Sequence, residues 1–302
     1  MNRKIVLSII VPIYNAERFL EENILKIENN NIENDYEIIL INDGSTDYSG
    51  EICNNLKSKF KNIIVIHTKN NGVSAARNEG INVSNGKYIC FIDSDDKFEC
   101  NISKIIIDIE SQPSDIYLYN TYYIENEKTN KREIYKKDIT INKFYSLVFG
   151  QKINAPWGKI FKSNIIKENK LHFDENLSLG EDYDFLIKYC KYIKKIKILK
   201  DCKYYYLINS NGLSNNIKTN IFYQEFILYS NSIEILNNLN NSNIHKYILK
   251  NTIFKAYLHK IARYIVILNE KNKFKKLPLE NKKIIINNKA INIKEKILKQ
   301  CI

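Results

Sequence analysis

The chain has 302 residues, 44% of them hydrophobic, and a formal net charge of +12, which allows one large α/β domain or two smaller ones with substantial cores. No stretch approaches the roughly 18 apolar residues that a membrane-spanning helix requires. The apolar run near the N-terminus ends at Pro12 without a small-residue cleavage site, so we expect a first strand there and no signal peptide. The six cysteines form no C-x-x-C pair, which predicts buried, reduced thiols in a cytosolic protein.

The positive charge is concentrated towards the C-terminal end of the chain. Residues 1–100 have a net charge of −4 and residues 101–214 a net charge of +5, whereas residues 215–302 contain 16 basic and 5 acidic residues. Such a basic segment attracts anionic lipid headgroups or nucleic acid, and the alternative is a solvated face of a Lys-rich protein. Because it has no recognised nucleic-acid-binding motif, we expect no nucleic-acid partner and keep an anionic membrane surface as a candidate partner.

Strand-like and helix-like segments alternate regularly in the first hundred residues. The expected strands are 7–11, 36–41, 62–67 and 88–92, and the expected helices are 17–29, 47–60 and 73–83. Alternation at this spacing predicts a mostly parallel sheet with helices on both faces, and ligands bind such sheets at the carboxyl ends of the strands. Polar segments follow these expected ends at 14–15, 43–47, 69–72 and 93–96.

The pattern is looser after residue 100. We expect a helix at 101–111, a strand at 116–120, a polar excursion or hairpin at 125–138, strands at 154–161 and 196–208, and a helix beginning at Glu181. Beyond residue 218 the periodicity is helical, over 222–239, over 245–268 and on to the end. The predicted organisation is a domain at 1–214, with halves 1–100 and 101–214, followed by a basic helical region at 215–302.

Two carboxylates follow the last strand of the first hundred residues. Asp93 and Asp95 are two positions apart, so their side chains are expected to share one face of the chain. Two like charges this close repel each other, and oxygen-only ligation favours Mg²⁺ or Mn²⁺, ions that keep waters and take substrate phosphates as further ligands. From these residues alone, the alternative is a solvated acidic turn or a helix N-cap.

Five short motifs follow one another along the N-terminal third. They are VPIYN at 11–15, NDGSTD at 42–47, NNG at 70–72, SAARNEG at 74–80 and DSDD at 93–96, with WGK at 157–159 and GEDYDF at 180–185 further on. Over about residues 5–214 the chain resembles the inverting GT-A glycosyltransferases of family two, of the kind that build bacterial surface polysaccharides. The resemblance implies a Rossmann-like nucleotide-binding α/β domain, with a mostly parallel sheet flanked by helices, and a C-terminal helical region.

The resemblance places the donor pocket at the ends of the first two strands. It implies that Pro12, Tyr14 and Asn15 line a uracil pocket, where a Tyr ring offers a stacking face and an Asn can read the base edge. It also implies that Asp43 accepts a hydrogen bond from the uracil or the ribose. For Tyr14 the alternative is an ordinary packing role.

The resemblance also assigns the metal site. Asp95 is the expected direct ligand of Mn²⁺ or Mg²⁺, Asp93 is expected to hold the ribose or a metal-bound water, and Ser94 is assigned to the donor site beside it. Asp96 is expected to be peripheral. We therefore expect a divalent cation held between this motif and the donor diphosphate.

Arg77 lies on the third expected helix, close to the donor according to the resemblance. Its planar fork suits either a donor phosphate or an aspartate of the metal motif. The alternative is an ion pair on the helix surface with Glu79 or Glu22.

The acceptor side is represented by the two later motifs. The resemblance implies that Asp182 is the general base, which takes the proton of the acceptor hydroxyl, and that Glu181 supports it. The alternative is that these acids only complement the dipole of a helix that starts there. Trp157, the single Trp, offers an apolar face to an acceptor sugar or belongs to the core.

One departure from the family pattern concerns the donor diphosphate. Family members often carry Arg or His after a late aromatic cluster, whereas here Tyr204–Tyr206 is followed by Leu-Ile-Asn-Ser. Lys203 and Lys218 are the candidates to replace that basic group.

The expected function is metal-dependent, inverting transfer of a hexosyl or N-acetylhexosaminyl group from a UDP-sugar to a hydroxyl of a glycan. The expected acceptor is lipid-linked and belongs to capsule, lipo-oligosaccharide or O-antigen synthesis, so we expect a cytoplasmic protein, peripheral at the inner face of the membrane. The oligomeric state stays open, a homo-oligomer included. The alternative function is a non-catalytic nucleotide-sugar-binding or scaffolding protein on the same fold.

Overall fold

The structure is a computed structural model that describes residues 5–28, 35–125, 128–132, 138–208, 221–239 and 242–270. The chain forms two compact units. The first comprises residues 1–141, 155–175 and 192–209, and the second comprises residues 142–154, 176–191 and 210–302. The predicted boundary near 214 and the Lys/Ile-rich end of the chain lie outside the described residues, so the domain limits stay a prediction.

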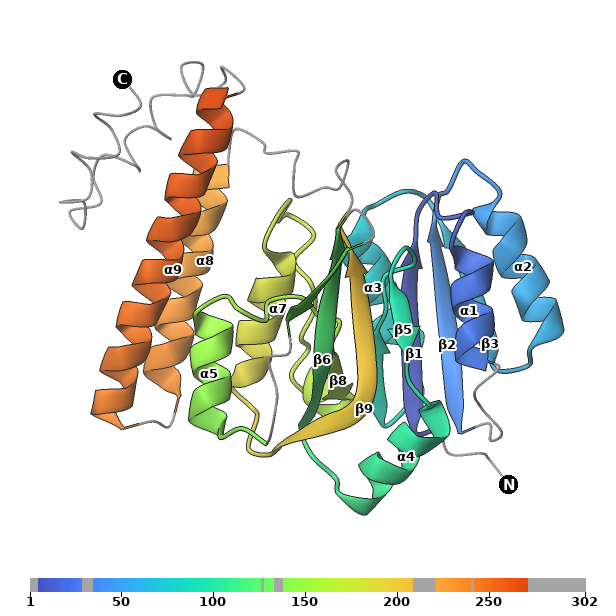
Figure 1. The fold of residues 1–302 in the computed structure, drawn as a ribbon, viewed down its shortest axis with the longest axis horizontal. Helices are drawn as coiled ribbons and strands as arrows, with labels where there is room; N and C mark the ends of the chain where they lie inside the picture. Colours follow the sequence, from blue (N-terminus) through green and yellow to red (C-terminus); the bar gives the residue numbers. More distant parts are fainter. Residues whose placement is uncertain are drawn as a thin grey trace. The chain divides into compact units, whose positions relative to one another are not determined.

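A mixed sheet is the framework of the first unit (Figure 1). The strand order is β3-β2-β1-β4-β8-β6-β9-β5, and β7 pairs with β6. The strands are β1 (Leu7–Ile13), β2 (Tyr36–Asp43), β3 (Ile63–Thr68), β4 (Tyr88–Phe91), β5 (Lys97–Glu99), β6 (Ile116–Glu125), β7 (Lys128–Arg132), β8 (Lys159–Lys162) and β9 (Ile196–Leu207). The first four strands form the predicted parallel half, and antiparallel pairing begins where β8 joins β4. The predicted α/β fold is therefore confirmed.

Helices cover both faces of the parallel half, as predicted. They are α1 (Leu20–Glu28), α2 (Ser49–Lys59), α3 (Val73–Val83) and α4 (Ile102–Ser111). Buried residues of α1, α2 and α4 share one core cluster with Ile9 and Val11 of β1. On the opposite face Gly80 of α3 lies against Ile10, so closely that an added Cβ would come within 2.4 Å of the Ile10 side chain. This double cover explains why β1 and β2 are buried along their whole length and read as nearly continuous apolar runs.

The differences from the predicted elements lie after residue 92. The sequence periodicity missed β5, which has three residues, the helix α5 (Ile141–Phe149) and the short helix α6 (Ser163–Glu168). The strand predicted at 154–161 begins only at Lys159, because Gly158 has a φ of 73° and turns the chain just before it. The predicted hairpin at 125–138 exists as the pairing of β6 with β7.

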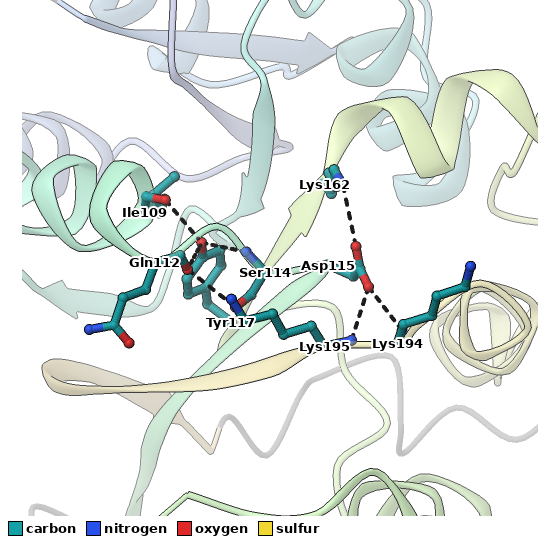
Figure 2. A network of polar contacts seen from close by, with 8 residues as sticks. All are labelled: Ile109, Gln112, Ser114, Asp115, Tyr117, Lys162, Lys194 and Lys195. Atoms are coloured by element: carbon teal, nitrogen blue, oxygen red, sulfur yellow. Dashed lines mark hydrogen bonds and ion pairs between the residues drawn. The ribbon is translucent and has the colours of Figure 1, made fainter.

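A polar network holds the amino ends of β6 and β9 next to the carboxyl end of β8 (Figure 2). Asp115 accepts hydrogen bonds from the backbone N–H groups of Lys194 and Lys195 and pairs with Lys162 at 3.3 Å. The Tyr117 hydroxyl accepts from the Ser114 N–H and donates to a carbonyl at the end of α4. These contacts lie at the opposite end of the strands from the predicted ligand edge, so we interpret them as structural.

The second unit is helical in its described part. Its helices are α5 (Ile141–Phe149), α7 (Glu181–Cys190), α8 (Ile221–Asn238) and α9 (Asn243–Glu270). The predicted C-terminal helices are thus confirmed as α8 and α9, which lie side by side (Figure 1). Glu225 of α8 is buried and is neutralised by Lys260 of α9 at 2.7 Å. Tyr183 of α7 is joined to Ser232 of α8 by a hydrogen bond of 2.9 Å.

Two further expectations concern the whole described chain. Within the described ranges, no helix combines the length and apolar character needed to cross a membrane. Five of the cysteines are free and buried, as predicted: Cys53, Cys90, Cys100, Cys190 and Cys202.

Candidate active site

The polar segments of the N-terminal third meet at one edge of the sheet. The parallel register pairs Ile13 with Asn42 and Asp43 with Thr68, so the loops after β1, β2 and β3 leave the sheet side by side. β4 pairs with β1, and the turn at 93–96 follows it at the same edge. This is the edge at which parallel α/β sheets bind ligands.

The loop after β1 is tied to the loop after β2 by Asn15. Its backbone has a φ of 51°, and its side-chain oxygen accepts a hydrogen bond of 2.8 Å from the Thr46 N–H. Tyr14 is 52% exposed, so it is not a core residue, and its stacking role stays a prediction. Pro12 is buried within β1, and its role in lining a uracil pocket stays a prediction.

Asp43 organises the loop after β3, a role that the sequence did not indicate. One carboxylate oxygen accepts from the Asn71 N–H at 2.9 Å and from the Thr68 hydroxyl at 3.2 Å, and the other accepts from the Gly72 N–H at 2.8 Å. The side chain is buried. Gly44 next to it has a φ of 68°, and an added Cβ would meet the Asn70 nitrogen at 2.6 Å, so the turn requires glycine.

Arg77 binds an aspartate of the carboxylate motif, which was one of the contacts expected from the sequence. Its guanidinium lies 2.9 Å from an oxygen of Asp93, and only 4% of the Arg77 side chain is exposed. The guanidinium also lies 5.3 Å from the ring centre of Phe173, at a distance suited to a cation–π contact. A surface ion pair is therefore excluded, and Arg77 orients Asp93.

The turn at 93–96 is held from inside by Tyr204 of β9. The Tyr204 hydroxyl accepts a hydrogen bond of 3.1 Å from the Asp93 N–H and donates one of 2.7 Å to Asp96. Asp96 also accepts from the Leu207 N–H at 2.8 Å. Desolvation, with a smaller effect of the Asp93 charge, raises the pKa of Asp96 to about 8. Asp96 therefore helps to fix the shape of the turn, and its peripheral place relative to a ligand stays a prediction.

The same turn presents Asp95 outward. Asp95 is exposed, whereas Asp96 is 1% exposed. Partial loss of water around the carboxyl, and then repulsion from Asp93, raises the pKa of Asp95. Ser94 is half-buried, and its carbonyl accepts a hydrogen bond from Asn23 of α1.

These carboxylates fit a divalent ion that shares its ligands with a phosphate. No group of three or more His, Cys, Asp or Glu side chains that could hold a metal is found among the described residues. Mg²⁺ and Mn²⁺ accept one or two protein carboxylates when substrate phosphates and waters complete the shell. An outward Asp95, next to an Asp93 whose charge is partly neutralised by Arg77, is such an arrangement.

Trp157 lies in an aromatic cluster with Tyr204, Tyr206 and Tyr123. Its ring is stacked on Tyr204 at 5.0 Å and 8° and on Tyr206 at 5.3 Å and 24°. Trp157 is partly buried against the main core cluster. The core-packing alternative is therefore present in the structure, and a sugar-binding role for this ring stays a prediction.

Glu181 and Asp182 begin α7 in the second unit, whereas the donor-side residues belong to the first unit. Gly180 precedes them with a φ of 91°. The third acid of this turn, Asp184, is 1% exposed and is bound by Lys188 and Asn231. Glu181 and Asp182 are only half-buried and stay the candidates for proton transfer.

Two residues of the site region were not singled out from the sequence. Tyr204 was noticed only as part of an aromatic cluster. Asn78 donates to the Phe173 carbonyl and to Glu175, and accepts from the Phe173 N–H, so it fixes the segment that follows α6. In the sequence, the only indication of a role for Asn78 was its position next to Arg77. Of the two candidates for the missing basic group, Lys218 lies outside the described residues and Lys203 is exposed on the face of β9 opposite to Tyr204.

The mixed sheet flanked by helices defines the class, a GT-A-like α/β fold, and its polar groups gather at the edge where such sheets bind ligands. Residues 8–169 match the family described as "Glycosyl transferase family 2". The chain belongs to this family.

Known proteins agree with that assignment. Over 213 residues the chain is 35% identical to "Poly(ribitol-phosphate) beta-glucosyltransferase" of Bacillus spizizenii. The matched residues cover 68% of the chain and 33% of that relative. For the first three curated relatives the match spans between 31% and 63% of their length.

Two solved structures share the fold. Residues 1–349 of Staphylococcus aureus TarS in complex with UDP-GlcNAc match with a TM-score of 0.72 and 20% identity, over 92% of this chain and 83% of that one. The mannosyltransferase PcManGT of Pyrobaculum calidifontis in complex with GDP-Man and Mn²⁺ matches with a TM-score of 0.55 and 12% identity. The match covers 98% of this chain and 82% of that one.

Proposed function

We propose that the chain is a metal-dependent, inverting glycosyltransferase that moves a hexosyl or N-acetylhexosaminyl group from a UDP-sugar to a hydroxyl of a glycan. The observation that carries the proposal is the turn at 93–96, in which Arg77 orients Asp93 and Tyr204 fixes the backbone while Asp95 faces outward. A scaffold that only bound a partner would have no need for an oriented pair of carboxylates at the ligand edge.

On the donor side each residue has a separate task. Tyr14 offers its exposed ring to the uracil, and Asn15 and Asp43 fix the shape of the loops at the ligand edge through the backbone N–H groups that they bind. Asp95, with Asp93 beside it, holds the divalent ion. The ion, when bound, stabilises the negative charge of the departing UDP.

On the acceptor side Asp182 is the proposed general base. It removes the proton of the acceptor hydroxyl as the oxygen attacks C1 of the sugar, on the side opposite to the diphosphate. Glu181 supports it at the start of α7. Because transfer occurs in one displacement, an α-linked donor gives a β-linked product.

The acceptor is proposed to be a lipid-linked surface glycan of the capsule, lipo-oligosaccharide or O-antigen type. Relatives named for teichoic acid synthesis, among them one that acts on poly(ribitol-phosphate), support a phosphate-containing cell-surface polymer as a further candidate. Such acceptors are assembled at the membrane, so we propose a cytoplasmic protein that is peripheral at its inner face.

The donor site is tested by thermal unfolding with UDP and a panel of UDP-sugars, each with Mn²⁺ and with EDTA. We expect stabilisation by UDP that is larger with Mn²⁺ and largest with one UDP-sugar. Asp95→Asn should remove the Mn²⁺-dependent part, whereas Asp201→Asn, which neutralises an exposed aspartate of β9, should retain it. No response to any uridine nucleotide would overturn the UDP-sugar assignment.

Release of UDP in the presence of an acceptor separates catalysis from the scaffold alternative. A protein that is stabilised by UDP-sugar and Mn²⁺ but never releases UDP, with any acceptor from a membrane extract, would support the non-catalytic reading.

A further inference from the structure

The first two turns of α9 expose three large apolar side chains. Ile244 is 74% exposed, Tyr247 is 69% exposed and Ile248 is 50% exposed. Their spacing of three and four residues places them on one face of the helix. We call these three residues the apolar tip. Since large apolar side chains are seldom left in water as a contiguous group, the tip is a candidate contact surface.

Basic residues and no acid surround the apolar tip on its own helix. α9 contains five Lys or Arg residues, and its first acid is Glu270, the last residue of the helix. Lys255 is exposed on the same face as the tip, two turns further on, and Lys250 is exposed beside it. On the neighbouring helix the exposed acid is Glu234, one turn before the end of α8. The surface therefore combines apolar side chains with net positive charge.

The dimensions of the tip suit the interface of a lipid bilayer. With a rise of 1.5 Å per residue, Ile244 and Ile248 are separated by roughly 6 Å along the helix axis. Helices that bind a bilayer interface lie in its plane with the apolar face buried by about 5–10 Å, a depth that suits these side chains. Lys255 follows on the same face at roughly 10 Å beyond Ile248, so a helix lying on the bilayer brings it to the lipid phosphates as well. A soluble polyanion would use the lysines and leave the apolar tip in water.

We propose that the apolar tip of α9 inserts into the interfacial layer of an anionic membrane, with Lys250 and Lys255 on the lipid phosphates. This site is on the second unit and is independent of the donor site. It assigns membrane contact to described residues of α9 and does not depend on the basic segment that follows the helix in the sequence.

The test is flotation of the full chain with vesicles of phosphatidylglycerol and phosphatidylcholine, compared with phosphatidylcholine alone. We expect binding to the anionic vesicles that falls at least tenfold in the triple variant Ile244→Ser, Tyr247→Ser, Ile248→Ser. The matched control is Ile107→Ser, which removes a 64% exposed side chain from α4 and should leave binding unchanged. Lys250→Gln with Lys255→Gln should weaken the preference for the anionic lipid.

Three outcomes would overturn the proposal. Vesicle binding that survives in the triple variant shows that another part of the chain is the anchor. Loss of binding in the lysine variant alone indicates recognition of a polyanion without insertion. A smaller mass of the triple variant in light scattering assigns the tip to contact between copies of the chain. Stabilisation by UDP, measured in parallel, should be equal in all variants and shows that each is folded, so a failed donor site is distinguished from a failed tip.

Discussion

Tyr204→Phe is expected to uncouple the carboxylate turn from the rest of the fold. The substitution removes one hydroxyl and keeps the ring that stacks on Trp157. The hydroxyl makes two bonds, one at 2.7 Å to Asp96 and one at 3.1 Å from the Asp93 N–H. Without it, the buried carboxylate of Asp96 keeps the Leu207 N–H and loses its other donor.

The loss can be estimated from these two bonds. A buried polar group left without its partner costs about 1–3 kcal/mol. Asp93 is partly exposed, so water can replace part of its bond, and the larger share falls on Asp96. We expect the free energy of unfolding to fall by about 2 kcal/mol, and the melting temperature by roughly 4–8 °C at about 2–4 °C per kcal/mol.

The effect on function should appear in metal-dependent binding. If the turn loses its fixed shape, Asp95 no longer meets the ion and the diphosphate together, and we expect the affinity for UDP in the presence of Mn²⁺ to fall about tenfold, or about 1.4 kcal/mol. Affinity for UDP with EDTA depends on the base and the ribose and should change little. Calorimetry under both conditions measures the difference.

Tyr206→Phe is the matched control, because it removes a hydroxyl from the same strand and keeps a ring that also stacks on Trp157. An equal loss of Mn²⁺-dependent affinity in both variants, or no loss in Tyr204→Phe, would refute the role of the hydroxyl. If Tyr204→Phe lowers the affinity for UDP equally with Mn²⁺ and with EDTA, the hydroxyl supports the fold and has no separate effect on the turn at 93–96.

The remaining predictions concern the base, one turn and the buried thiols. Asp182→Asn should keep donor binding and lower kcat by about 10²-fold or more, and wild-type turnover would remove Asp182 from its role. Gly44→Ala should destabilise the protein by about 2 kcal/mol or more, because the alanine is strained at positive φ and its Cβ comes too close to Asn70. Gly72 also has a positive φ, but no atom lies within 4 Å of an added Cβ there, so Gly72→Ala should lower the free energy of unfolding less in the same urea titration. Burial raises the pKa of Cys53 and Cys90 to about 12, so only the unfolded chain ionises these thiols between about pH 9 and 12. The free energy of unfolding should therefore fall with rising pH in that range, by up to about 1.4 kcal/mol per thiol and pH unit, and a flat profile in denaturant titrations would contradict it.

The parallel half of the fold was predictable because each signal there is local. β1 and β2 are buried along their whole length since both faces are covered, and the residues at the end of β2 are Asn, Asp, Gly and Ser, which favour turns and helix starts. The second half was harder to predict because its strands pair with partners distant in sequence. The strand β5 has three residues and exists by pairing with β9, about a hundred residues later, which periodicity cannot show.

Residue chemistry predicted which groups lie at the site, but not which partners hold them. Arg77 had several plausible partners in the sequence, and only the packing of α3 on β1 and β2, next to the turn that follows β4, selects Asp93. Asp43 was assigned to the ligand, although the structure shows it first holding the loop at 71–72 through two backbone N–H groups. Both are buried charges, which need several partners at once, and those partners come from segments that sequence spacing does not connect.

The two clusters of acids show the same limit from opposite sides. In the turn at 93–96, Asp96 is taken up by Tyr204 and Leu207, which leaves Asp95 outward. At the start of α7, Asp184 is 1% exposed and is held by Lys188 and Asn231, whereas Glu181 and Asp182 are half-buried. In each cluster one acid is almost completely buried and the others are more exposed, and in a sequence these two kinds of acid look alike. A buried carboxylate that the fold already satisfies has little left to offer a ligand, so we expect substitution of the more exposed acids to alter binding or turnover more than stability.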